Sequence, residues 1–350
     1  MRVKPNALSL YKNELWCACE ISQNLIMIDT HNNSITEAVP LPFELKKDSE
    51  EYVVMQAFES GVVVAENIMN SLFIYEKDRK KWNKIDFEKI GNGGQLFSCS
   101  YRFGDDIYLF PGSSDEIVVY NIASRSVAMK KKLLSWINEI INKELCVINP
   151  VCVLNNHEVV GTNSENNEIF IYNVLDDKAK TVRIGRDDAK YSSCASPKGK
   201  IILFDKNNCC LVLLDDNMNI YKEMKIPKGG YRLLKYSDEY VLVDSIYEDD
   251  IYIVDANLDS SIVQKKCNNV NIRRRNNLGR IVSGSGEVYY YNRVDNALYL
   301  IDVHGMVKNS SLPELGEDIA RNILQRYGGT TIIERNDFTI ENYTWLLSID

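Results

Sequence analysis

A repeated pattern of apolar residues constrains the fold of this chain more than any other feature. Seven times, one apolar residue is followed ten positions later by four consecutive apolar residues, and an acidic or amide residue closes the group. The quartets begin at Leu25, Leu72, Ile117, Ile169, Leu211, Ile251 and Leu298, at intervals of 40 to 52 residues. Their upstream partners are Leu15, Val62, Ile107, Val159, Ile201, Val241 and Val288. A constant spacing inside units of variable length indicates a structural repeat.

Each repeat reads as four strands joined by tight turns. In the third unit the strands are SCSYRF, DIYLF, EIVVYN and SVAMKK. The second and third strands are continuous apolar runs, so both faces of each small sheet must be covered, and sheets stacked side by side provide that cover. The Asp, Asn or Glu after each quartet suits the start of a turn. The repeat length of about 45 is typical of propeller blades. We therefore expect an all-β, seven-bladed β-propeller of four-stranded blades over residues 1–312.

Two segments do not follow the repeat. Residues 133–146 contain LLSWINEIINKEL, whose apolar residues recur at helical spacing. This predicts a short helical insertion that either packs on the disc or presents Trp136 to a partner. Residues 313–350 predict a helix-strand-helix extension packed on the propeller, with TTIIE between its helices. The extension would brace the seam between the last and first blades, and the pattern leaves open whether TTIIE adds a closing strand.

Two stretches carry a resemblance to known families. NLIMIDTHNNSITEAVPLP and IYIVDANLDSSIVQ resemble the third and fourth strands of YVTN-type propeller repeats. The array as a whole is similar to WD-repeat, Kelch-like and YVTN-type β-propellers, and to uncharacterised bacterial propeller proteins that end in a strand and a helix. The repeating motifs of the WD and Kelch families are absent, so the resemblance implies a fold class and no functional residues.

Composition argues against several function classes. The net charge of -8 disfavours a nucleic-acid or anionic-membrane partner, because both require a basic face. No apolar run is long enough for a signal peptide or a membrane span, which predicts a cytoplasmic protein. Nine cysteines without CxxC spacing predict thiols that act as small core residues. The three histidines and the paired aspartates fall in expected turns, so we expect no metal and no cofactor.

The hairpins between second and third strands distinguish two halves of the ring. In repeats three to five their tips are polar, whereas those of repeats six, seven, one and two contain apolar residues. The apolar tip residues are Ile21, Ile68, Met69, Ile246, Tyr247 and Val294. Because those four repeats are consecutive in a closed ring, the tips would form one arc that binds a protein or peptide partner. The alternative is that each tip packs against a neighbouring blade or under a crossing loop.

A second group of candidates lies near the starts of the first strands, at the expected mouth of the central channel. Its members are Tyr52, Phe97, Tyr191, Tyr231, Arg232 and Arg273. Aromatic rings beside guanidinium groups could stack on a glycan or hold a small anionic ligand. The alternative is aromatic packing between blades, with arginines on the surface.

Enzymatic motifs are scarce. No GxSxG, GxGxxG, HExxH or P-loop spacing is present. We therefore expect a non-enzymatic interaction module or scaffold that binds a protein or peptide on the loop-rich face. The alternative is a propeller enzyme, a hydrolase or lyase acting on a glycan or peptide-like substrate at the channel mouth.

Overall fold

The computed structural model describes residues 5–19, 22–43, 45, 53–66, 70–88, 96–112, 116–132, 152–155, 157–162, 166–245, 250–265, 280–283, 288–292, 297–301 and 307–311. These residues form seven antiparallel sheets of four strands each. In every sheet the four strands are consecutive along the chain and pair in sequence order, so each sheet is a simple meander. This confirms the all-β, four-stranded repeat unit.

The strand bounds are as follows. The first sheet has β1 (Pro5–Tyr11), β2 (Glu14–Cys19), β3 (Asn24–Asp29) and β4 (Ser34–Pro40). The second has β5 (Val54–Phe58), β6 (Gly61–Ala65), β7 (Ser71–Glu76) and β8 (Lys81–Asp86). The third has β9 (Phe97–Phe103), β10 (Asp106–Pro111), β11 (Glu116–Asn121) and β12 (Ser126–Lys132). The fourth has β13 (Cys152–Val153), β14 (Glu158–Thr162), β15 (Glu168–Asn173) and β16 (Lys178–Arg183).

The remaining sheets follow the same plan. The fifth has β17 (Tyr191–Ala195), β18 (Ile202–Asp205), β19 (Cys210–Leu214) and β20 (Ile220–Lys225), with a 3-10 turn at Pro197–Gly199. The sixth has β21 (Tyr231–Lys235), β22 (Tyr240–Ser245), β23 (Asp250–Asp255) and β24 (Ser261–Lys265). The seventh has β25 (Arg280–Ser283), β26 (Val288–Asn292), β27 (Ala297–Ile301) and β28 (Val307–Ser311).

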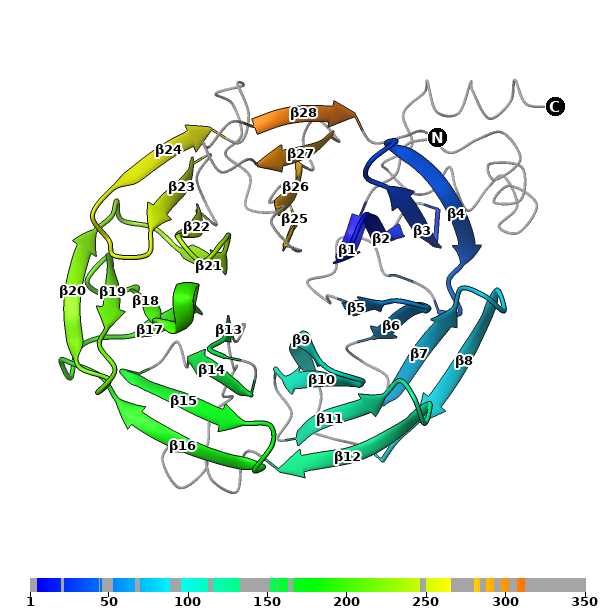
Figure 1. Cartoon of the computed structure of the whole chain (residues 1–350), viewed down its shortest axis with the longest axis horizontal. Helices are drawn as coiled ribbons and strands as arrows, with labels where there is room; N and C mark the ends of the chain where they lie inside the picture. Colours follow the sequence, from blue (N-terminus) through cyan, green and yellow to red (C-terminus); the bar gives the residue numbers. More distant parts are fainter. Residues whose placement is uncertain are drawn as a thin grey trace.

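The sheets are arranged in a ring, with the first strand of each sheet toward the centre and the fourth on the rim (Figure 1). The last sheet reaches the first, because β25 packs against β1, which also packs against β5. A meander places alternate connections on opposite faces of the disc. We call the side with the hairpins between second and third strands, together with the crossings between sheets, the loop-rich face. The other side, with the remaining turns, is the turn face.

The strand register explains the constant ten-residue spacing in the sequence. Every quartet lies in a third strand, and its last residue pairs with the upstream apolar residue across the hairpin. Examples are Val62 opposite Tyr75 in the second sheet and Ile107 opposite Tyr120 in the third. A one-residue change in the hairpin would shift this register and turn the buried side chains to the opposite face. The crossings between sheets carry no such constraint, so the variation in repeat length falls there.

In five of the sheets, the first and the third to sixth, the residue after the quartet begins a turn and accepts a backbone hydrogen bond, as expected from its side chain. Asn173 Oδ1 accepts hydrogen bonds from the backbone N–H groups of Leu175 (2.9 Å) and Asp176 (3.1 Å). Asp215 does the same for Asn217 (2.9 Å) and Asn219 (2.8 Å). These bonds satisfy backbone donors that the sheet leaves unpaired.

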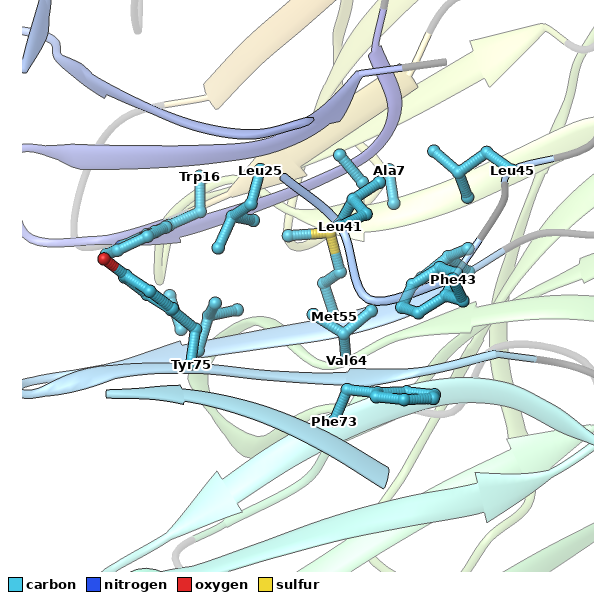
Figure 2. Packing of buried hydrophobic residues seen from close by; sticks show 14 of the residues in the cluster. Ala7, Trp16, Leu25, Leu41, Phe43, Leu45, Met55, Val64, Phe73 and Tyr75 are labelled. Atoms are coloured by element: carbon cyan, nitrogen blue, oxygen red, sulfur yellow. The ribbon is translucent and has the colours of Figure 1, made fainter. Parts of the chain in front are cut away.

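The core lies between neighbouring sheets. Figure 2 shows the cluster between the first two, where Trp16 and Tyr75 meet edge to face with ring centroids 6.0 Å apart. The crossing from the first sheet to the second adds Leu41, Phe43 and Leu45 to this cluster. Covering both faces of every sheet in this way accounts for the continuous apolar runs in the second and third strands.

Serine hydroxyls link several inner strands. Ser9 Oγ in β1 accepts a hydrogen bond from the backbone N–H of Ala57 in β5, at 2.8 Å. Ser193 Oγ in β17 accepts an equivalent bond from Leu233 in β21, also at 2.8 Å. An innermost strand is a sheet edge, whose backbone donors need partners outside the sheet. The hydroxyl of the preceding sheet supplies that partner at these two positions.

The expected helical insertion at 133–146 and the extension at 313–350 lie outside the described residues. Within the part of the chain that the structure covers, no helix has the length and apolar character needed to cross a membrane.

Candidate functional site

The six predicted partner-binding residues, Ile21, Ile68, Met69, Ile246, Tyr247 and Val294, lie outside the described residues. Their sheets are described, however. The packing of β1 against both β25 and β5 makes the seventh, first and second sheets neighbours, and the sixth precedes the seventh around the ring (Figure 1). The four sheets whose hairpins are expected to have apolar tips are therefore consecutive around the ring.

The hairpin of the first sheet is covered by the following crossing. Gln23 is buried and holds Leu45 by two hydrogen bonds, from the Leu45 N–H to Oε1 at 2.7 Å and from Nε2 to the Leu45 carbonyl at 3.0 Å. Ser22 and Asn24 are buried with it. A lone glutamine in the hairpin is the one sign of this contact in the sequence. Its partner could not be predicted, because Leu45 is 22 residues away and no strand register relates the two.

The hairpin of the fifth sheet shows how a polar tip is built. The Asp205 carboxylate is buried and accepts hydrogen bonds from the backbone N–H groups of Asn207 (3.1 Å) and Asn208 (3.2 Å), and from Asn208 Nδ2 (2.7 Å). Such a tip satisfies its own polar groups. It contrasts with the apolar tips on the other side of the ring.

Three of the predicted channel-mouth residues are buried between sheets. Phe97, Tyr191 and Tyr231 are at most 2% exposed. Phe97 packs against Phe87 with ring centroids 6.3 Å apart, and Tyr231 packs against Phe204 at 5.2 Å. Of the two interpretations of these three rings, their burial agrees with aromatic packing between blades. A position at the start of a strand does not determine which side of the strand the side chain occupies, and here these rings fill gaps between sheets.

The tyrosine hydroxyls are also engaged inside the protein. Tyr191 donates to the Ile184 carbonyl at 3.2 Å, and Tyr231 donates to the Pro227 carbonyl at 3.1 Å. Burial raises the pKa of Tyr191, and the nearby Asp205 adds to the effect. Burial likewise raises the pKa of Tyr231, with Tyr252 as the next contributor. Neither phenol is suited to exchange protons with a substrate at neutral pH.

Arg232 is the candidate of this group that keeps a polar, partly exposed side chain. It lies opposite Asp244 in the register of β21 and β22, and its Nε donates to Asp244 Oδ2 at 3.0 Å. The arginine side chain is 33% exposed, whereas the aspartate is fully buried. Asp244 was not predicted from the sequence, although the strand register places it opposite Arg232. The remaining two candidates, Tyr52 and Arg273, lie outside the described residues.

Five of the seven described cysteines are core groups, whereas Cys99 and Cys209 are partly buried. Cys17, Cys19, Cys152, Cys194 and Cys210 are all buried. A hydrogen bond with Cys194 and burial both raise the pKa of the Cys152 thiol, and burial raises the pKa of Cys210 to about 11. Thiols with raised pKa values are poor nucleophiles. Over the described residues, no group of three or more His, Cys, Asp or Glu side chains could hold a metal ion.

Large apolar side chains are exposed on the rim. Ile262 and Val263 are consecutive in β24 and are 44% and 49% exposed, and Tyr221 in β20 is 71% exposed. An ion pair between Lys222 and Asp259 shows that β20 lies beside the turn that leads into β24. These residues were not predicted from the sequence, because a fourth strand on the rim need not be buried on either side.

Comparison with known proteins agrees on the fold. No protein-family model and no curated protein matches the chain. Among solved structures, a streptogramin B lyase matches with a TM-score of 0.61 at 11% identity, over 83% of this chain and 91% of that protein. U3-55K matches with a TM-score of 0.54 at 8% identity, over 81% and 86%. PorZ of Porphyromonas gingivalis, described as a surface component of the type-IX secretion system, matches at 0.58 and 9%, over 90% of this chain and 39% of that protein.

The all-β ring of four-stranded sheets and its propeller-type structural neighbours define the class of protein: the chain has a β-propeller fold. The neighbours differ in kind, and they include a lyase and U3-55K. At identities near 10%, these similarities show the fold and do not select a function.

Proposed function

We propose that the chain is a closed, seven-bladed β-propeller over residues 1–312, with residues 313–350 packed on it, and that it acts as a non-enzymatic interaction module. It binds a protein or peptide on the loop-rich face, at the arc of hairpin tips that contains Ile68, Met69, Ile246, Tyr247 and Val294. Ile21 lies at the middle of the arc. An apolar surface of this kind with a polar surround is typical of a protein interface.

The observation that carries the proposal is the contact of β1 with both β25 and β5. This contact makes the seventh, first and second sheets neighbours, so we expect their hairpin tips to lie side by side although residues 21 and 294 are far apart in the chain. Without it, the six residues would be scattered single apolar side chains, which are common on protein surfaces.

Two further observations shape the expected interface. Ser22 and Gln23 are buried under the crossing, so the tips of the second, sixth and seventh sheets contribute more than Ile21. Ile262 and Val263 are exposed in β24, the rim strand of the sheet whose hairpin contains Ile246 and Tyr247.

The test is affinity capture from native lysate with mass spectrometry, using the wild-type chain and an Ile68→Asp, Ile246→Asp double variant. Its matched control is Ser114→Asp with Ser164→Asp, which adds the same charge to the polar tips of the third and fourth sheets. The proposal expects a protein retained by the wild type and the control and lost by the apolar-tip variant. Equal retention by all three folded chains would refute the arc as the binding surface.

The alternative of a propeller enzyme receives no support from the predicted channel-mouth tyrosines. Tyr191 and Tyr231 are buried, and their hydroxyls are bonded to backbone carbonyls. The lyase similarity is a similarity of fold at 11% identity.

A further inference from the structure

Two cationic side chains meet one aromatic ring on the turn face, beside the centre of the ring of sheets. Lys12 Nζ lies 5.2 Å from the centroid of the Tyr11 ring, and Arg102 Cζ lies 5.7 Å from the same centroid. Tyr11 and Lys12 are at the end of β1 and in the turn that follows, whereas Arg102 is near the end of β9. Residues of the first and third sheets therefore converge across the inner strand of the second.

Neither cation is neutralised within the described part of the chain. Arg102 donates from Nε to the Gly104 carbonyl at 2.7 Å, and no described carboxylate forms an ion pair with it or with Lys12. Glu59 and Asp105 occupy the adjacent turns and make no ion pair with either cation. Other described cations do have an acidic partner, as Lys77 has in Glu14.

The shared ring keeps the two charges close to each other. With both cationic groups within 6 Å of one centroid, their separation is at most the sum of two cation–π distances. An anion that contacts both groups gains two charge attractions, and it also relieves whatever repulsion between the two cations the solvent leaves unscreened. The ring fixes the positions of both groups before any ligand arrives, which lowers the ordering cost of binding.

We propose that Lys12, Arg102 and Tyr11 form a binding site for a phosphate group. Two cations match the charge of a phosphate monoester, which is about -1.5 to -2 at pH 7. The guanidinium N–H groups that Gly104 leaves available can bind two phosphate oxygens, and the lysine ammonium can bind a third. A single carboxylate would neutralise only one of the two cations. The site is on the opposite face from the proposed partner-binding arc and does not depend on it.

The test uses inorganic phosphate and phenyl phosphate as probes, with binding followed by ³¹P NMR line broadening and by isothermal titration calorimetry. We expect millimolar binding by the wild type, a decrease of at least about tenfold in a Lys12→Gln, Arg102→Gln variant, and weaker binding as NaCl is raised. The matched control is Lys178→Gln with Lys228→Gln, which removes the same charge from exposed positions elsewhere. It should bind phosphate as the wild type does.

The outcomes are distinct. Tighter binding of phenyl phosphate than of inorganic phosphate supports a phosphate ester as the natural ligand, and equal binding supports free phosphate. Equal losses in the two double variants would show a response to net charge alone and overturn the site, as would no binding by the wild type up to about 10 mM. Circular dichroism of each variant establishes that it is folded. The Lys12→Gln single variant changes only an exposed side chain, so it can be tested if the double variant does not fold.

Discussion

The hydrogen bond from the Ala57 N–H to Ser9 Oγ offers a direct test of how neighbouring sheets are joined. The bond is buried, 2.8 Å long and links β5 to β1. Replacing Ser9 with alanine removes the acceptor and creates almost no cavity, because only one oxygen atom is lost. The Ala57 N–H would then be buried without its partner on the inner edge of the second sheet.

The expected loss of stability follows from that orphaned donor. Leaving a buried backbone donor unsatisfied costs about 1–3 kcal/mol. This cost exceeds the net contribution of a typical intramolecular hydrogen bond to stability, because in the unfolded chain the same groups bond to water. Ser193→Ala should cost a similar amount, because Ser193 Oγ accepts from the Leu233 N–H in the same way. The two bonds join different pairs of sheets and share no partner, so the double variant should lose the sum to within about 0.5 kcal/mol.

The assay is urea denaturation followed by circular dichroism, together with hydrogen exchange of the peptide that contains β5. Ser9→Ala should lower the free energy of unfolding and speed exchange at Ala57. Ser124→Ala is the control, since the Ser124 hydroxyl is in an exposed turn. It should change stability by no more than about 0.5 kcal/mol. If Ser9→Ala behaves like Ser124→Ala in both measurements, the inner edge does not depend on the serine hydroxyl and the reasoning is wrong.

Three other perturbations have defined outcomes. Gly61→Ala would place a Cβ 1.9 Å from a backbone carbonyl oxygen of β7, so it should destabilise the fold by about 1–3 kcal/mol or more. The Cβ of Gly104→Ala would meet no atom within 4 Å, so this variant adds only the strain of its positive φ. Thermal unfolding of both variants checks that order. Arg232→Gln should cost more stability than an Asp244→Asn, Arg232→Gln double variant, because the single change leaves a buried carboxylate without its arginine; denaturation of both measures the difference. Asp255→Asn should flatten the acid dependence of stability and lower stability at pH 7, because the amide lacks the second acceptor oxygen that the Asp259 and Ser260 N–H groups use; a pH series of unfolding midpoints tests both effects.

The pH prediction depends on the turn after the sixth quartet. Burial tends to raise the pKa of Asp255, but hydrogen bonds from the backbone N–H groups of Asn257, Ser260 and Asp259 outweigh it, and the net effect is a lowered pKa. A carboxylate with a lowered pKa stabilises the fold fully above its unfolded value of about 4, and that stabilisation is lost as pH falls through the folded value. Asn121 and Asn173 make the same turn in other sheets with an amide oxygen. The asparagine variant should therefore keep the hydrogen bond from Asn257 and lose both the titration and the bonds that Asp255 Oδ2 accepts.

The sequence predicted the strands well because the pattern that specifies them is local. A quartet such as Leu72 to Tyr75 must be buried on both faces, and its fixed distance from Val62 encodes the hairpin register. The turns were equally predictable, because an Asx side chain at the end of a strand acts on backbone groups within a few residues. Both features depend on residues within one repeat.

The side chains near the channel were predicted less well because their surroundings are set by other sheets. Phe97 and Tyr231 occupy similar places in the sequence of their repeats, and both turned out to fill space between sheets. The contact of Arg102 with Tyr11 joins the first and third sheets and has no local signal at all. Pairing rules within a sheet give register, whereas contacts between sheets depend on how the ring closes.

The two proposed sites use the two faces of the disc in different ways, and this makes them independently testable. Crossings of variable length lie on the loop-rich face, so that face can present an extended apolar surface to a large partner. The turns between first and second strands are short, and their inner ends bring single side chains such as Tyr11 and Arg102 together near the centre. A small ligand fits such a place better than a protein does. Hence the Ile68→Asp, Ile246→Asp variant should leave phosphate binding unchanged. The Lys12→Gln, Arg102→Gln variant should leave partner capture unchanged. A folded variant that loses both activities would instead show that they share one site.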